Sequence, residues 1–179
     1  IVDALRSFAE LGNVAIVGAP GAGKSSCLYS LASQLRDENT DVVLIAADIL
    51  DASSPERLAQ EVGIESAHSL VAVLQNWSGD GSGYLIIDAM DAARVGMNLR
   101  VLCTVLRNVS EQAPRWRLLV SIREYDLRAS AEVQRLFPGT PHSVHQDPRF
   151  KHVRHLQISQ LSDDEIKQTK SAHAKLASA

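Results

Sequence analysis

The stretch Gly18-Ala-Pro-Gly-Ala-Gly-Lys-Ser25 follows the apolar run Val14–Val17 and leads into a helical pattern. It matches the spacing G-x-x-x-x-G-K-[ST], and it lies where that motif is expected, between a strand and a helix. Glycines let the backbone turn tightly, so that successive N–H groups point at phosphate oxygens. The first turn of the next helix adds its own N–H groups and the positive end of its dipole. The stretch therefore predicts a phosphate-binding loop.

The residue types in this loop predict how a nucleotide is held. We expect Lys24 to reach the β- and γ-phosphates and the Ser25 hydroxyl to bind Mg²⁺. A glycine-rich turn with an exposed lysine is the alternative interpretation. The dinucleotide spacing G-x-G-x-x-G fails, because Gly21-x-Gly23 is followed by Ser26. The sequence thus favours a mononucleotide, contacted by Gly18, Ala19, Pro20, Gly21, Ala22, Gly23, Lys24, Ser25 and Ser26, the last near the α-phosphate.

Apolar runs alternate with helical patterns along the chain. Four runs are almost purely apolar, as in strands that are buried on both faces of a parallel sheet, and a fifth is more mixed. The mixed run is an edge strand or a strand beside a loop. Between the runs, apolar residues recur at helical spacing. We expect a three-layer α/β fold with a five-stranded, mainly parallel sheet flanked by helices; the runs are Val14–Val17, Val42–Ala47, Tyr84–Ile87, Leu118–Ile122 and Val153–Ile158.

The domain organisation is expected to be simple. Residues 1–160 form one P-loop nucleotide-binding domain, with Phe137–Phe150 as a long irregular loop. The pattern Ser162-Asp-Asp-Glu165 is typical of a capping box, so 161–179 would begin a helical segment that leads to an absent downstream domain. Because the chain begins at Ile1 and not at Met, we expect a piece of a longer protein.

The amino-acid composition limits the kinds of partner that this chain is expected to bind. The 179 residues are 45% hydrophobic and 22% charged, with a net charge of −3, which argues against a broad nucleic-acid surface. No apolar run is long enough to span a membrane. Cys27 and Cys103 fall on apolar helical stripes, where packed, reduced thiols are expected, as in a cytoplasmic protein. The phosphate-binding loop makes a nucleotide the expected partner, and the composition predicts no membrane partner and, for this domain alone, no nucleic acid, although a local basic patch stays open.

Two aspartates follow the third apolar run. Asp88 ends this run, and we expect it to hold Mg²⁺ through water, opposite Ser25. A cap on the next helix is the alternative role for Asp88. Asp91 is the candidate that orients or deprotonates the attacking water, and the alternative is an N-cap for a helix starting near Ala92.

Arg123 ends the fourth apolar run. An arginine at this end of a central strand could contact the γ-phosphate and report its presence. A structural salt bridge with Glu124 or Asp126 is the alternative. Arg94 and Arg128 are weaker candidates for a phosphate contact.

Two histidine pairs could suggest a zinc site, His142-x-x-His145 and His152-x-x-His155. A spacing of three on a strand points the two side chains to opposite faces, and no cysteine is close in sequence. We therefore expect no zinc site.

In combination, GAPGAGKS, YLIIDAMDAAR and LLVSIREYDLR resemble the STAND class of P-loop ATPases, which includes NACHT and NB-ARC modules. The resemblance implies ASCE strand order, with the Walker A and Walker B strands separated by the Arg123 strand. It makes Lys24 and Ser25 the Walker A pair, Asp88 the Walker B residue, Asp91 the second acidic position and Arg123 the sensor. It further implies an ATP/ADP switch that needs Mg²⁺, separate sensor and effector domains, and homo-oligomerisation on activation. Several bacterial members act in antiviral defence.

Two departures from related patterns matter. NACHT-type sequences often place another acidic residue where Ala92 stands, and AAA+ machines place Glu where Ala89 stands. We therefore expect slow ATP hydrolysis or a binding switch. The alternatives are an AAA+ DNA-handling ATPase and a P-loop small-molecule kinase, whose arginine-rich lid would have only Arg128 and Arg135. A GTPase would need an N-K-x-D motif, and the sequence has none.

Overall fold

The computed structural model describes residues 1–65, 67–94 and 98–160. Strands and helices alternate through most of this range, as the apolar pattern predicts. The strands are β1 (Val14–Gly18), β2 (Val42–Ala46), β3 (Gly83–Asp88), β4 (Trp116–Arg123) and β5 (His155–Gln157). The α-helices are α1 (Val2–Glu10), α2 (Lys24–Asp37), α3 (Pro55–Glu61), α4 (Leu70–Gln75), α5 (Asn98–Gln112), α6 (Glu124–Ala129) and α7 (Ala131–Gln134), and the 3₁₀ helices are η1 (Met90–Arg94) and η2 (Pro148–Phe150).

The five strands form one sheet in the order β2-β3-β4-β1-β5, and every neighbouring pair is parallel. β4, which ends in Arg123, lies between the strand that precedes the glycine-rich loop and the strand that ends in Asp88. This is the order that the resemblance implies. β5 is an edge strand, so the first of the two alternatives for the mixed run is confirmed. β2 forms the other edge.

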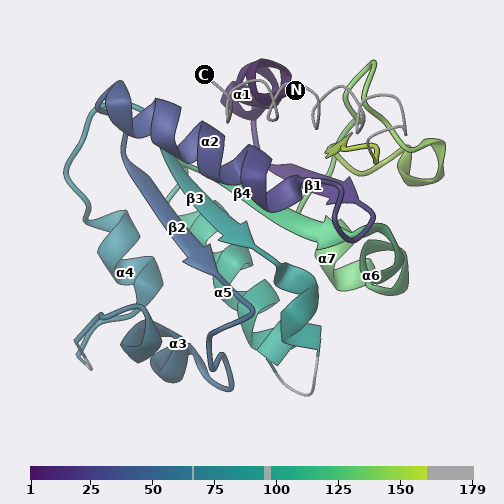
Figure 1. Cartoon of the computed structure of the whole chain (residues 1–179). Coiled ribbons are helices and arrows are strands. Elements are labelled where there is room, and N and C mark those ends of the chain that lie inside the picture. The colour runs from purple at the N-terminus through teal and green to yellow at the C-terminus, as the bar shows by residue number, and fades with distance from the viewer. Residues whose placement is uncertain (66, 95–97, 161–179) are drawn as a thin grey trace, which may run out of the picture.

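Helices cover both faces of the sheet (Figure 1). Val14 and Ile16 pack with α1 and α2 on one face, and Ala15 and Val17 pack with the core of α3, α4 and α5 on the other. This alternation follows from the two-residue period of a strand. The predicted three-layer α/β fold is thus confirmed.

Both cysteines are free and buried, as predicted. Burial raises the pKa of the Cys27 thiol and raises that of Cys103 to about 12. Thiols with raised pKa values remain protonated at neutral pH, which suits a packing role.

The start of α3 follows from its local sequence. Ser54 caps α3 by accepting a hydrogen bond from the Arg57 N–H, and Pro55 takes the first helical position. The segment Phe137–Phe150 lacks long elements, but its backbone is tied to β5, since the Gln157 N–H donates to the His145 carbonyl. The predicted capping box at Ser162 lies outside the described residues. Within the described ranges, no helix has the length and apolar character needed to cross a membrane.

Candidate functional site

The glycine-rich loop connects the end of β1 to the start of α2, at the carboxyl edge of the sheet (Figure 1). Gly21 and Gly23 have φ angles of 75° and 92°, in the left-handed region where residues with a Cβ are strained. Gly18 is needed for a different reason. A Cβ at this position would lie 2.6 Å from the carbonyl oxygen of Ile158, because the chain after β5 passes directly beside it.

Lys24 lies folded against the loop. Its Nζ donates hydrogen bonds to the carbonyl oxygens of Gly18 and Ala19, at 3.0 and 2.9 Å. Burial lowers the pKa of Lys24, the charge of Arg123 lowers it further, and the carboxylates of Asp91 and Asp88 oppose the shift. The sheet places Arg123 beside Gly18, Arg123 pairs with Asp91, and Asp88 is bonded to Ser121 of the same strand, so these charged groups lie at one edge of the sheet near Lys24. A phosphate group there would meet two cations and two carboxylates.

Asp88 ends β3 and is only 6% exposed. Its Oδ1 accepts a hydrogen bond of 2.5 Å from the hydroxyl of Ser121 on the neighbouring strand β4. The Ser121 hydroxyl in turn accepts from the Ala89 N–H at 2.8 Å. Ala89 adopts a φ of 55°, a left-handed conformation that costs a non-glycine residue about 1 kcal/mol. The turn after β3 is therefore held in a strained geometry by a hydroxyl that also orients Asp88.

The sequence interpretation missed Ser121. The available signal was a single hydroxyl within the apolar run Leu118–Ile122, at a position that the sheet buries completely. A buried polar side chain needs a hydrogen-bond partner, and here the partner is the carboxylate at the end of the next strand.

Asp91 and Arg123 form an ion pair, with Arg123 Nε 2.7 Å from Asp91 Oδ2. Asp91 is 6% exposed and lies inside η1, so it does not act as the N-cap of a helix starting at Ala92. Arg123 occupies the N-cap position of α6, and its side chain is 43% exposed. A salt bridge was expected with Glu124 or Asp126 as the alternative role. Instead, the structure pairs Arg123 with Asp91, while Glu124 lies 2.7 Å from Arg149.

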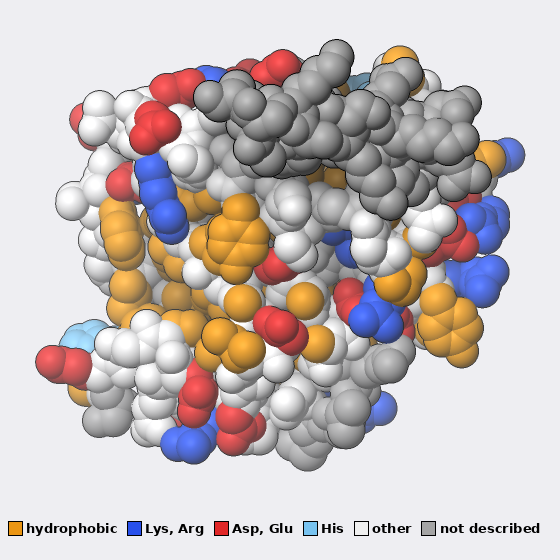
Figure 2. Space-filling model, viewed as in Figure 1, with side chains coloured by type: hydrophobic (Ala, Val, Ile, Leu, Met, Phe, Trp, Pro, Cys, Tyr) orange, Lys and Arg blue, Asp and Glu red, His pale blue; other side chains and the backbone are white. Residues whose placement is uncertain are grey.

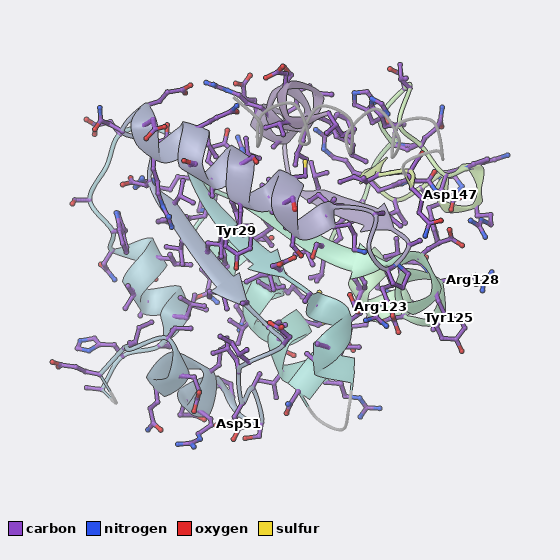
Figure 3. All side chains as sticks on the ribbon, in the orientation of Figure 1. Tyr29, Asp51, Arg123, Tyr125, Arg128 and Asp147 are labelled. Carbon is purple, nitrogen blue, oxygen red and sulfur yellow. The ribbon has the colours of Figure 1, made fainter. Side chains whose placement is uncertain are left out.

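Arg128, one of the two weaker arginine candidates, does not join this group. Arg128 is exposed on α6 and lies over the ring of Tyr125, 5.8 Å from its centroid. Figure 3 shows both side chains at the outer side of α6. The side chain of Arg94 lies outside the described residues.

The donor set fits a magnesium ion that arrives with phosphate. Within the described ranges, no group of three or more His, Cys, Asp or Glu side chains could hold a metal by itself. Mg²⁺ typically takes one or two carboxylates, hydroxyls, water and phosphate oxygens, so the Asp88 carboxylate and the Ser25 hydroxyl are suitable ligand types. In the second histidine pair, the His155 ring is not available to a zinc ion. Both ring nitrogens of buried His155 are engaged, by the Asp147 N–H and by the Val153 carbonyl.

A cavity of about 620 Å³ adjoins the loop on the β5 side. Ser26 and Cys27 of α2 line one wall, and His145, Gln157 and Ile158 line the other. Ligands of parallel α/β sheets bind outside the carboxyl ends of the strands, where this cavity lies.

Comparisons with known proteins agree with this geometry. The chain is similar to AMPPCP-bound DnaA from Aquifex aeolicus, with a TM-score of 0.59 and 13% identity, over 97% of this chain and 49% of that one. It is also similar to the Aeropyrum pernix Orc1 protein in complex with DNA, with a TM-score of 0.59 and 16% identity, over 97% of this chain and 48% of that one. The chain has the fold of a P-loop NTPase.

The chain also shows similarity in sequence to a bacterial receptor protein. The signal recognition particle receptor FtsY of Bacillus subtilis is 27% identical over 135 residues, which are 75% of this chain and 38% of the receptor. No family model matches the chain. The chain spans about half the length, or less, of each protein it resembles.

Proposed function

We propose that this chain is the nucleotide-binding core of a STAND-type signalling ATPase, an ATP/ADP switch with slow, Mg²⁺-dependent hydrolysis. The observation that carries the proposal is the convergence of Lys24, Asp88, Asp91 and Arg123 beside the glycine-rich loop. The family resemblance extends the proposal to a cytoplasmic protein with sensor and effector domains, homo-oligomerisation on activation and a role in bacterial defence.

The binding step follows from the loop geometry. The N–H groups of Gly21 to Ser25 would hold the phosphates, and Lys24 would exchange its two carbonyl partners for phosphate oxygens. Ser25 and Asp88 would hold Mg²⁺, with Asp88 oriented by Ser121. Bound Mg²⁺ would neutralise charge on the phosphates. The cavity beside Ser26 would take the base and ribose.

In this proposal, the Arg123–Asp91 ion pair serves both the nucleotide switch and ATP hydrolysis. Arg123 is held by Asp91, and its partly exposed side chain can turn toward a γ-phosphate. That turn would release the Asp91 carboxylate to orient water. Ala89 and Ala92 offer no second carboxylate to assist proton removal, which supports slow turnover.

An AAA+ DNA-handling ATPase is the second candidate. The fold likeness to DnaA and to an Orc1 protein solved with DNA favours it. The net charge of −3 weighs against a DNA-binding surface on this domain. Fluorescence anisotropy with a labelled duplex distinguishes the two, because the switch proposal expects no binding at physiological salt.

A thermal-shift panel with Mg-ATP, Mg-ADP and Mg-GTP tests the nucleotide site. Ligand at a hundred times its dissociation constant stabilises the fold by about 2.7 kcal/mol. We expect adenine nucleotides to raise the unfolding midpoint of the wild type and of Lys151→Ala, an exposed control, but not of Lys24→Ala. If Lys24→Ala still bound ATP tightly, the assignment of the glycine-rich loop as the phosphate-binding site would be wrong. A shift with GTP alone would overturn the adenine assignment.

A further inference from the structure

Strand β2 leaves one backbone edge of the sheet open. It is the last strand in the order, and among the described strands only β3 pairs with it. The Asp41 carbonyl accepts from the Tyr84 N–H, and the Ala47 N–H donates to the Asp88 carbonyl. In a strand, the N–H and C=O of one residue point to the same side, and those of the next residue point to the opposite side. The backbone groups of the odd-numbered residues of β2 therefore face β3. The N–H and C=O groups of Val42, Leu44 and Ala46 therefore point away from the sheet.

The side chains of this edge do not protect it. Natural sheets guard exposed edges with charges, proline or bulges, and the strand Val-Val-Leu-Ile-Ala has none of these. Val42 and Leu44 pack toward the α2 side and remain half-exposed, and so does Val43 on the opposite face. Tyr29 projects from α2 toward this edge and is 50% exposed (Figure 3), and Ile49, just after the strand, is 76% exposed. Figure 2 shows hydrophobic side chains gathered there, between α2 and α4.

The segment that follows the apolar edge is acidic. Residues 48–57 carry three acidic side chains and one basic side chain, a net charge of −2. Glu38 and Asp41 precede β2 and pair with Arg6 and Arg115. Beyond the strand, Asp51 lies 3.4 Å from Arg57, whereas exposed Asp48 has no ion-pair partner among the described residues.

We propose that the β2 edge binds an extended peptide of a partner protein as a sixth strand. The open N–H and C=O groups provide backbone pairing, and the apolar surface on both faces selects apolar side chains. The acidic segment that follows β2 selects lysine or arginine where the end of the peptide lies against it. A second copy of this chain fits less well, because residues 37–56 around its own β2 contain no lysine or arginine to meet this acidic segment.

A synthetic peptide of sequence Lys-Val-Thr-Val-Thr-Val-Lys, labelled with fluorescein, serves as the probe. Fluorescence polarisation should show saturable binding to the wild type, and the matched peptide with Glu at both ends should bind at least tenfold more weakly. Leu44→Pro removes the N–H of residue 44, which points away from the sheet. The hydrogen bonds between β2 and β3 should remain, because proline is tolerated where the N–H of an edge strand faces solvent. Asp48→Lys reverses one charge. Each variant should weaken binding at least tenfold, and Glu111→Lys, the same charge change at an exposed position of α5, should not.

Amide hydrogen exchange provides the second measurement. The amides of Val42, Leu44 and Ala46 should exchange rapidly in the free protein and become protected by the peptide. If Leu44→Pro does not fold, Asp48→Lys and the exchange pattern decide the result. No binding to the folded wild type, or binding without protection of these amides, would overturn the proposal. Sedimentation showing a dimer that Leu44→Pro dissociates would also overturn it, because the occupant would then be a second copy.

Discussion

Arg123 Nε lies 2.7 Å from Asp91 Oδ2, which joins the end of β4 to the 3₁₀ helix that follows β3. The carboxylate is almost fully buried and the guanidinium is not. A buried carboxylate needs a counter-charge, so Asp91 depends on Arg123 more than Arg123 depends on Asp91. Lys24 is also close enough to feel both charges. Arg123 is therefore the member of the pair that a ligand can reach from solvent.

Replacing Arg123 by Gln should reduce ATP affinity more than ADP affinity. A hydrogen bond to a charged group contributes about 1.5–3 kcal/mol, so the loss for ATP should be about 10- to 100-fold. Isothermal titration of both nucleotides in the presence of Mg²⁺ measures the two affinities. Arg128→Gln, which removes an exposed arginine from the same helix region, should leave both unchanged. Equal losses for ATP and ADP would show that Arg123 does not read the γ-phosphate.

Asp91→Asn should spare nucleotide binding and stop turnover. The amide keeps the shape of the side chain but cannot accept a proton from water, and general bases contribute about 10²- to 10⁴-fold. Phosphate release measured at saturating Mg-ATP gives the turnover rate, and titration gives the affinity. Asp80→Asn, at an exposed position, is the control. Unchanged hydrolysis in Asp91→Asn would exclude Asp91 from the mechanism.

The sequence was informative where one local pattern has one physical solution. Runs without polar residues are either buried strands or buried helices. Their short length and the glycine-rich loop that follows the first run indicate strands. Asp88 could be expected near Lys24 because parallel strands bring their carboxyl ends to one edge of the sheet. These features depend on local pattern and on chain direction.

Contacts between side chains of different strands were not accessible in the same way. The partner of Arg123 was expected among its sequence neighbours, yet it is Asp91, 32 residues earlier. Ser121 had no local signal for its contact with Asp88, because that contact depends on the register of β3 against β4. Register is set by the whole sheet, and one sequence does not reveal it.

Gly18→Ala should destabilise the fold even without nucleotide. The new Cβ would lie 2.6 Å from the Ile158 carbonyl oxygen, and backbone cannot move away cheaply. Overpacking of this kind costs about 1–3 kcal/mol. Urea unfolding followed by circular dichroism measures the free energy of unfolding. Gly81→Ala is the matched control, since a Cβ there meets nothing within 4 Å, and it should change stability by no more than about 0.5 kcal/mol. Equal stability of the two variants would contradict the close approach.

The stability of the fold should decrease as the pH falls below about 6.5, the ordinary pKa of histidine. His155 is fully buried, its Nε2 accepts from the Asp147 N–H, and its Nδ1 lies 2.8 Å from the Val153 carbonyl. Burial lowers the pKa of His155, against the opposing effects of that carbonyl and of the Asp147 carboxylate. The unfolded chain therefore binds a proton more readily than the folded chain. The stability from neutral His155 is present above the unfolded pKa and is lost as the pH falls toward the folded pKa.

For one proton, this linkage has a maximal slope of about 1.4 kcal/mol per pH unit. Urea unfolding at pH values from 5 to 7.5 measures it. His155→Gln, whose amide oxygen can still accept from the Asp147 N–H, should lose most of this slope. His68→Gln removes an exposed histidine and should keep the slope. If His155→Gln keeps the wild-type slope, another group carries the pH dependence, and His142 is the next to test, because burial lowers its pKa as well.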